Sequence, residues 1–157
     1  MDKFPVYIHM EKCGGMSLHH AFRYAFSGYE ILKPWWYWSN EPKNFLSANE
    51  LRTLRRLHPA IRGIGGHTTR SYAGYEEIVD KPVFYFTFLR DPVARYLSHL
   101  NHQVNKMGIA WSIEDFVKEK RFNNLMVRRI VGFSDLEQAK NRLKTDFGMV
   151  GLFEKYD

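Results

Sequence analysis

The chain has 157 residues, of which 45% are hydrophobic and 16% aromatic. This length and composition suit one domain with a single sizeable core and exclude an intrinsically disordered chain, so we expect one domain over residues 1–157. The formal net charge of +6 favours an anionic ligand. Charge alone does not distinguish a nucleotide phosphate, an anionic polysaccharide and nucleic acid.

The cysteine and histidine content and the lengths of the apolar runs exclude further classes of protein. The single cysteine, Cys13, excludes an intramolecular disulfide, and the seven histidines have no metal-binding spacing. We therefore expect no metal cofactor. No apolar run approaches the roughly 18 residues that cross a membrane, and residues 1–12 lack the long apolar region of a signal peptide. We expect a protein without a membrane span, located in the cytoplasm.

The chain begins with a strand, a tight loop and a helix. Residues 4–10 read FPVYIHM, which is short, apolar and prone to β-structure. The glycine-containing segment EKCGG follows, and apolar residues within 16–27 then recur at the spacing of one buried helical face. A second such unit begins with the apolar run at 82–89, which predicts a strand buried on both faces, and continues through Arg-Asp-Pro at 90–92 into a helix.

The remaining elements complete an alternation of strands and helices. Further strands are predicted at 61–65 and 149–153. Helices begin where a hydroxyl stands three residues before a carboxylate, a capping-box pattern. The pairs are Ser47 with Glu50, Ser112 with Asp115, and Ser134 with Glu137. This alternation predicts an α/β protein with three layers, α/β/α, around a central and mostly parallel sheet.

The loop after the first strand, residues 11–17, is a candidate anion site. In α/β sheets, ligands bind beyond the carboxyl ends of the strands, where loops meet helix N-termini. Gly14 and Gly15 let the backbone turn its N–H groups inward, while Lys12 adds a mobile charge and Ser17 a hydroxyl donor. The lysine precedes the glycines, unlike in a Walker A loop, which disfavours a P-loop kinase. An ordinary strand–helix turn with a surface lysine is the alternative.

A second candidate anion site follows the strand at 82–89. Arg90 leaves the end of this strand and Ser98 lies two helical turns further on, so both side chains could reach one anionic group. Asp91 is expected to cap the helix or to orient an arginine. For this motif alone, an arginine in a surface ion pair is the alternative interpretation.

The two loops together resemble a known pattern. IHMEKCGGMSL looks like the 5'-phosphosulfate loop of the sulfotransferase superfamily that uses 3'-phosphoadenosine-5'-phosphosulfate (PAPS), and FTFLRDPVARYLSHLNH is similar to its 3'-phosphate motif. The pattern is closest to carbohydrate-type members related to heparan sulfate 2-O-sulfotransferases and to their bacterial relatives. The resemblance implies a P-loop-like fold and a PAPS-dependent O-sulfotransferase. A carbohydrate hydroxyl is the expected acceptor and 3',5'-ADP the expected product.

The resemblance also implies roles for the matching residues. Lys12 is expected to contact the phosphosulfate and to stabilise charge on the departing phosphate. Arg90 and Ser98 are expected to bind the 3'-phosphate. The 5'-phosphate is expected to be held, largely through backbone N–H groups, by Cys13, Gly14, Gly15, Met16 and Ser17.

The first loop departs from the family's common form at several positions. Met10 and Glu11 stand where the family has isoleucine and proline, and Cys13 and Met16 each stand where it has a threonine. Two hydroxyls are thereby lost, and backbone contacts remain. Because Glu11 adds a negative charge beside an anion site, we expect its side chain to point outward.

Histidine is the expected general base, because it titrates near neutrality. His67 is the best placed, since Gly66 and His67 come at the end of the strand predicted at 61–65, immediately after it and on the same side of the sheet as the two loops. In 2-O-sulfotransferase-like members a Gly-His at this point supplies the base; a histidine hydrogen-bonded in a turn is the alternative. We expect His9 to be packed in the first strand, and His99 and His102 to lie on the helix after the second loop.

The sequence specifies the acceptor poorly. The aromatic block from Trp35 to Trp38 could stack on sugar rings, cover an acyl chain or pack under a loop, and five arginines between residues 51 and 70 could bind an acidic glycan. A nucleotide kinase and a basic nucleic-acid-binding module are the rival functions, and we expect no nucleic-acid partner. The chain could be a fragment truncated at its C-terminus, a minimal member, or one completed by a partner subunit. A homo-oligomer is compatible with the sequence.

Overall fold

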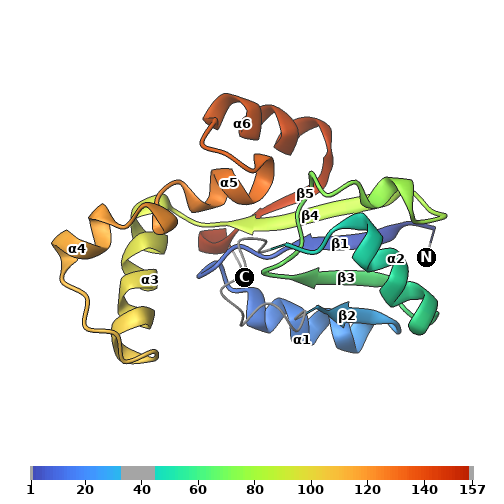
Figure 1. Ribbon diagram of the computed structural model, residues 1–157, viewed down its shortest axis with the longest axis horizontal. Coiled ribbons are helices and arrows are strands. Elements are labelled where there is room, and N and C mark those ends of the chain that lie inside the picture. The colour runs from blue at the N-terminus through green and yellow to red at the C-terminus, as the bar shows by residue number, and fades with distance from the viewer. Residues whose placement is uncertain (1, 33–44, 156–157) are drawn as a thin grey trace.

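A computed structural model describes residues 2–32 and 45–155, and within them five strands form one parallel sheet (Figure 1). The strand order is β2-β3-β1-β4-β5. The strands are β1 (Phe4–Ile8), β2 (Tyr29–Ile31), β3 (Gly63–Gly66), β4 (Val83–Leu89) and β5 (Phe147–Leu152). The predicted α/β class with a P-loop-like parallel sheet is confirmed.

Six α-helices and three short 3₁₀-helices accompany the strands within the described residues. The α-helices are α1 (Gly15–Ala25), α2 (Ala48–Leu57), α3 (Pro92–Asn105), α4 (Ile113–Lys118), α5 (Leu125–Val131) and α6 (Leu136–Thr145). The 3₁₀-helices are η2 (Tyr75–Glu77), η3 (Lys120–Phe122) and η4 (Phe153–Lys155). None of the helices in the described ranges is long and apolar enough to span a membrane.

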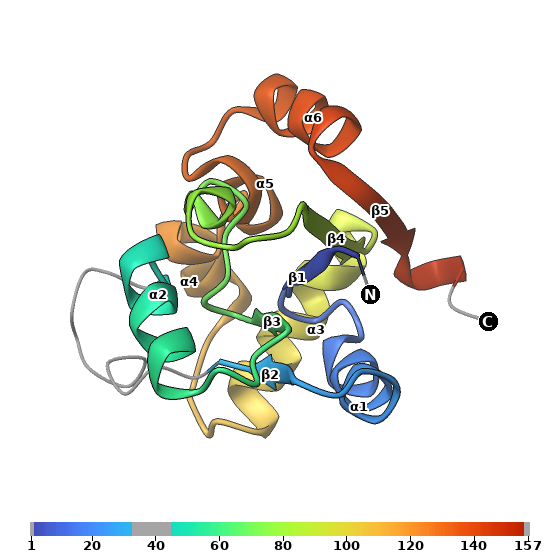
Figure 2. The same cartoon turned by 90° about the vertical axis from the view of Figure 1, so that its right-hand side faces the viewer.

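The side chains of β1 alternate between two cores because successive residues of a strand face opposite sides of a sheet. Val6 and Ile8 belong to the larger core, to which α2, α5 and α6 contribute. Tyr7 packs with Phe86 in the smaller core, beneath α1. Figure 2 shows α1 on the opposite side of the sheet from α2 and α5. The three-layer α/β/α arrangement follows from this division.

The strand register brings three loops to one edge of the sheet. In the central strand β1, Ile8 pairs with Gly66 of β3 and with Thr87 of β4. The strands run in parallel, so the segments that follow β1, β3 and β4 all leave the sheet on the same side. These segments carry the residues predicted to bind the nucleotide and to act as base.

The helix N-termini confirm two of the three predicted capping sites. Ser47 and Glu50 form a complete capping box on α2, and the Ser112 hydroxyl accepts a hydrogen bond from the backbone N–H of Asp115 at the start of α4. The prediction for Ser134 is wrong, because α6 starts one residue later and the Asp135 carboxylate caps it. A carboxylate accepts the same hydrogen bond and also interacts favourably with the helix dipole.

Strand β2 was not predicted from the sequence. It has three residues, too few for an alternating pattern, and it lies at the edge of the sheet, paired only with β3 among the described strands. Its Tyr29 is nevertheless buried. The aromatic block from Trp35 to Trp38 lies outside the described residues.

Candidate functional site

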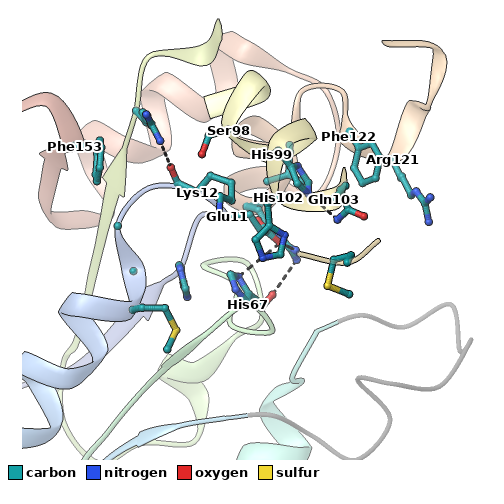
Figure 3. A pocket seen from close by; sticks show the side chains of 18 of the residues that line it. Glu11, Lys12, His67, Ser98, His99, His102, Gln103, Arg121, Phe122 and Phe153 are labelled. Carbon is teal, nitrogen blue, oxygen red and sulfur yellow. Dashed lines mark hydrogen bonds and ion pairs between the residues drawn. The ribbon is translucent and has the colours of Figure 1, made fainter. Parts of the chain in front are cut away.

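A cavity of about 680 Å³ opens at the carboxyl edge of the sheet (Figure 3). Loops after β1, β3 and β4 line it together with α3. Of the nine residues predicted to bind or react, eight line this cavity: Lys12, Gly14, Gly15, Met16, Ser17, His67, Arg90 and Ser98. Its size falls within the range of small-molecule sites.

The β1–α1 loop presents an open helix N-terminus to the cavity. Lys12 and Gly14 both have left-handed backbone conformations, with φ values of 68° and 77°, and the backbone N–H of Cys13 donates to the Met10 carbonyl at 3.3 Å. Helix α1 begins at Gly15, without a side-chain cap and without an acidic residue in its first turn. The N–H groups of a helix start and its dipole together favour an anion at such a place.

Cys13 is the one residue of the predicted set that does not line the cavity. Its side chain is fully buried in the larger core, and its Sγ lies 3.8 Å from the Glu11 carbonyl oxygen. Burial raises the pKa of this thiol to about 12. A contact between Cys13 and a nucleotide therefore stays a prediction for its backbone alone.

Arg90 connects the second loop to the first. Its Nη1 donates to the Lys12 carbonyl at 3.1 Å, and its guanidinium lies 4.5 Å from the ring centre of Phe153 in η4. The Nε atom of Arg90 is buried and has no hydrogen-bond partner among the described residues. Burial, followed by the nearby charge of Arg90, lowers the pKa of Lys12. Two positive groups in such proximity favour an anion between them.

The backbone around His67 is fixed by two arginines. The His67 carbonyl accepts hydrogen bonds from Arg70 Nη1 at 2.7 Å and from Arg129 Nη1 at 2.9 Å. The imidazole, whose side chain is 31% exposed, stacks on the ring of His9 with 3.9 Å between ring centres. The ring thus reaches the cavity from a firmly held loop, as Figure 3 shows.

Glu11 corrects an expectation from the sequence, because its side chain points into the site instead of outward. It forms an ion pair with Arg129, and its Oε1 lies 3.7 Å from His67 Nδ1. Burial opposes the ionisation of Glu11, but the charge of Arg129 and that of His67 in its protonated form outweigh it and lower the pKa of Glu11 to about 2. Arg129 lies 118 positions away in the sequence, so local pattern reasoning had no means of pairing the two.

Three further histidines line the cavity. His9 is buried as expected, but it follows β1 instead of lying within the strand, and burial, followed by the neighbouring His67 and His19, lowers its pKa to about 2. His99 and His102 lie on α3 and line the same cavity. Burial and then Arg95 lower the pKa of His99 to about 4.

Several residues at the site were not predicted. Gln103 and Arg121 line the cavity, and Phe153 lies against both Arg90 and Gly14, where a Cβ on Gly14 would come within 2.9 Å of its ring. Arg129 belongs to a stretch from Lys118 to Lys144 that contains eight lysines and arginines, whereas nothing in the local sequence marks Phe153. Within the part of the chain that the structure describes, no group of three or more His, Cys, Asp or Glu side chains could hold a metal ion.

A parallel sheet with an uncapped helix start and a basic cavity at its carboxyl edge defines a P-loop-like α/β/α protein suited to an anionic ligand. Among solved structures, the chain resembles a sulfotransferase from Alicyclobacillus acidocaldarius, with 19% sequence identity and a TM-score of 0.53. The match covers 99% of this chain and 75% of that chain. At this identity the likeness shows a shared fold. No protein-family model and no curated protein sequence matches the chain.

Proposed function

We propose that this chain binds PAPS in the cavity and transfers its sulfuryl group to a hydroxyl of an acceptor, which leaves 3',5'-ADP. One observation carries the proposal: the loop after β1, the loop after β4 and His67 all line one cavity. The two loops are joined by the hydrogen bond from Arg90 to the Lys12 carbonyl. PAPS has anionic groups at both its 5' and 3' positions, which matches two loops better than a ligand with one phosphate.

Two features of the chain fit such a donor. The start of α1 has no side-chain cap, so its N–H groups and Lys12 suit the 5'-phosphosulfate. The buried Nε of Arg90 has no partner among the described residues, and Ser98 lines the same cavity, so both side chains suit the 3'-phosphate. The likeness to a sulfotransferase fold supports this choice of donor over ATP.

In the proposed transfer, the acceptor oxygen forms a bond to sulfur while the bond from sulfur to the phosphate oxygen breaks. The hydroxyl proton passes to the neutral imidazole of His67, and the nearby carboxylate of Glu11 stabilises the imidazolium that results. Lys12 stabilises the charge that develops on the departing phosphate. Positioning and electrostatics supply most of the catalysis in the related transfer of phosphoryl groups, and we extend this to sulfuryl transfer.

The proposed acceptor is a carbohydrate. This part of the proposal rests on the resemblance of the two sequence motifs to carbohydrate-type sulfotransferases. A screen with labelled PAPS against hydroxylated glycans, lipids and small phenols tests it, and labelling of phenols alone would overturn it.

Calorimetric titration tests the donor site. We expect 3',5'-ADP to bind at least about tenfold more tightly than 5'-AMP, since a hydrogen bond to a charged group contributes roughly 1.5–3 kcal/mol. Equal affinities would remove the role proposed for Arg90 and Ser98. Tighter binding of ATP than of 3',5'-ADP would favour a kinase.

Replacement of the base tests the chemistry. His67→Ala is expected to lower turnover about a hundredfold to ten-thousandfold while 3',5'-ADP binding is retained. His58→Ala, at an exposed position outside the cavity, is the matched control and should leave turnover unchanged. Near-normal turnover of His67→Ala would show that another group is the base.

A further inference from the structure

Three buried side chains form a hydrogen-bonded chain beneath the first loop. The hydroxyl of Tyr29 on β2 lies 3.0 Å from Nδ1 of His19 on α1. Nε2 of His19 in turn lies 3.0 Å from Nδ1 of His9, which follows β1. All three residues are at least 95% buried. The hydrogen bonds of this network have no part in the proposed donor contacts or in the proposed action of the base.

The direction of these hydrogen bonds follows from the tyrosine. Burial raises the pKa of Tyr29, so the phenol keeps its proton. His19 is the only hydrogen-bond partner of its hydroxyl among the described residues, so Tyr29 donates to Nδ1 of His19. A neutral imidazole carries one N–H. His19 therefore has its proton on Nε2 and donates to Nδ1 of His9.

The same reasoning fixes the proton of His9. Its Nδ1 accepts from His19, so its single N–H is on Nε2. The imidazole stays neutral, since burial and the neighbouring histidines lower its pKa to about 2. No hydrogen bond from Nε2 of His9 exists within the described residues.

Two glycines make room for His9 and Tyr29, the two ends of this hydrogen-bond network. A Cβ on Gly15 would lie 1.9 Å from Nε2 of His9, and a Cβ on Gly65 would lie 2.0 Å from the hydroxyl of Tyr29. Neither position could hold a side chain without displacing this network. Nε2 of His9 thus lies directly against the first residue of α1, whose uncapped start lines the cavity.

We propose that His9 is a further binding residue, whose Nε2–H is a neutral donor to the anionic group held at the start of α1. If the proposed function holds, on which this identification of the ligand rests, that group is the 5'-phosphosulfate of PAPS. Tyr29 and His19 act as positioning residues, because they prevent His9 from turning an acceptor nitrogen toward the anion. Hydrogen bonds in such a chain also polarise one another and strengthen the last donor.

The tautomers of the two histidines provide a test that requires no ligand. Long-range ¹H–¹⁵N spectra of the labelled wild-type protein at neutral pH should show both His9 and His19 protonated on Nε2. A proton on Nδ1 of either ring would mean that the chain runs in the opposite direction and would overturn the proposal. This test is independent of whether the protein is a sulfotransferase.

Nucleotide titration tests the contact itself. His9→Phe keeps a flat ring and removes the donor, and it should weaken binding of 3',5'-ADP about tenfold to a hundredfold. Its affinity for 3'-AMP, which lacks the 5'-phosphate, should be unchanged, which also shows that the variant folds. His20→Phe on the exposed side of α1 is the matched control and should bind both nucleotides like the wild type.

The outcomes separate this proposal from the proposed function. If wild-type protein binds neither nucleotide, the proposed function fails. If wild-type protein binds 3',5'-ADP and His9→Phe binds it equally well, or loses affinity for both nucleotides equally, only the role of His9 fails. If His9→Phe does not fold, Tyr29→Phe is the milder test. It removes the hydroxyl that fixes the tautomer of His19 and, through it, that of His9. It should weaken 3',5'-ADP binding several-fold, and wild-type affinity would overturn the proposal.

Discussion

The starts of α1 and α3 each follow a loop that lines the cavity, but only one of these helix starts is open. At α1, Gly14 takes a left-handed conformation and supplies no side-chain cap. At α3, the Asp91 carboxylate accepts a hydrogen bond from the N–H of Ala94 at 2.8 Å, and Pro92, which has no N–H, occupies the first turn. The N-terminus of α3 is therefore already satisfied by the chain, whereas that of α1 is not.

Because of this difference, the two strand–loop–helix units would bind the proposed anionic groups by different means. The first loop offers backbone N–H groups, a lysine and, in our proposal, a buried imidazole donor. The second loop must rely on the side chains of Arg90 and Ser98, because its helix start is closed. Substitutions should therefore affect the two loops differently.

Removal of the lysine should damage the first loop most. Lys12→Ala should lower turnover about a hundredfold to a thousandfold, since it removes a charge aimed at the leaving group. Lys118→Ala, an exposed lysine outside the cavity, is the control. Steady-state kinetics with labelled PAPS measure both variants, and an equal loss in the two would contradict a specific role for Lys12.

Acid should destabilise the scaffold of both loops through their buried histidines. The pKa values of His9 and His99 are lowered from 6.5 to about 2 and about 4. Below pH 6.5 the unfolded chain therefore binds protons that the folded chain does not. The free energy of unfolding should fall by about 1.4 kcal/mol per pH unit for each histidine between about pH 6 and 5, above the range where Glu11 titrates.

Chemical denaturation at a series of pH values measures this slope. His9→Phe and His99→Phe should each reduce the slope of the unfolding free energy against pH by about 1.4 kcal/mol per pH unit. The two variants thus compare the buried histidine near the first loop with the one near the second. His20→Phe, at an exposed position, should leave the slope unchanged. An unchanged slope in His9→Phe would mean that His9 is protonated in the folded protein.

Two serines compare backbone and side-chain binding directly. Ser98→Ala should weaken 3',5'-ADP about tenfold and leave 5'-AMP unchanged, because the second loop depends on side chains. Ser17→Ala should have a smaller effect, because the backbone N–H groups of α1 remain. Calorimetry with both nucleotides measures this, and a larger loss in Ser17→Ala than in Ser98→Ala would invert the comparison.

Loss of the cap on α3 should be the mildest change. Asp91→Ala should lower the free energy of unfolding by about 1 kcal/mol, the usual contribution of an N-cap. Ser134→Ala should have no effect, since Asp135 caps α6 in its place. Denaturant titration distinguishes the two, and equal losses would restore the original prediction for Ser134.

The features that could be predicted from the sequence are those that depend on residues close together in it. The strands at β1, β3, β4 and β5 and the two loops were located because apolar periodicity and glycines mark them locally. Pairing across the chain was out of reach, and this explains the wrong expectation for Glu11, whose partner Arg129 comes from α5. The hydrogen bonds that link Tyr29, His19 and His9 were also missed, because they join three separate elements. In addition, β2 is too short to show a sequence pattern.

The position of Phe153 has a consequence for synthesis of the protein. This ring packs against Arg90 of the second loop and lies close to Gly14 of the first, yet it follows β5, the last strand described. A nascent chain that has emerged from the ribosome only as far as β4 can contain both loops without the ring that lies between them. The cavity between the two loops is therefore completed only after residue 153 has emerged and β5 has joined the edge of the sheet.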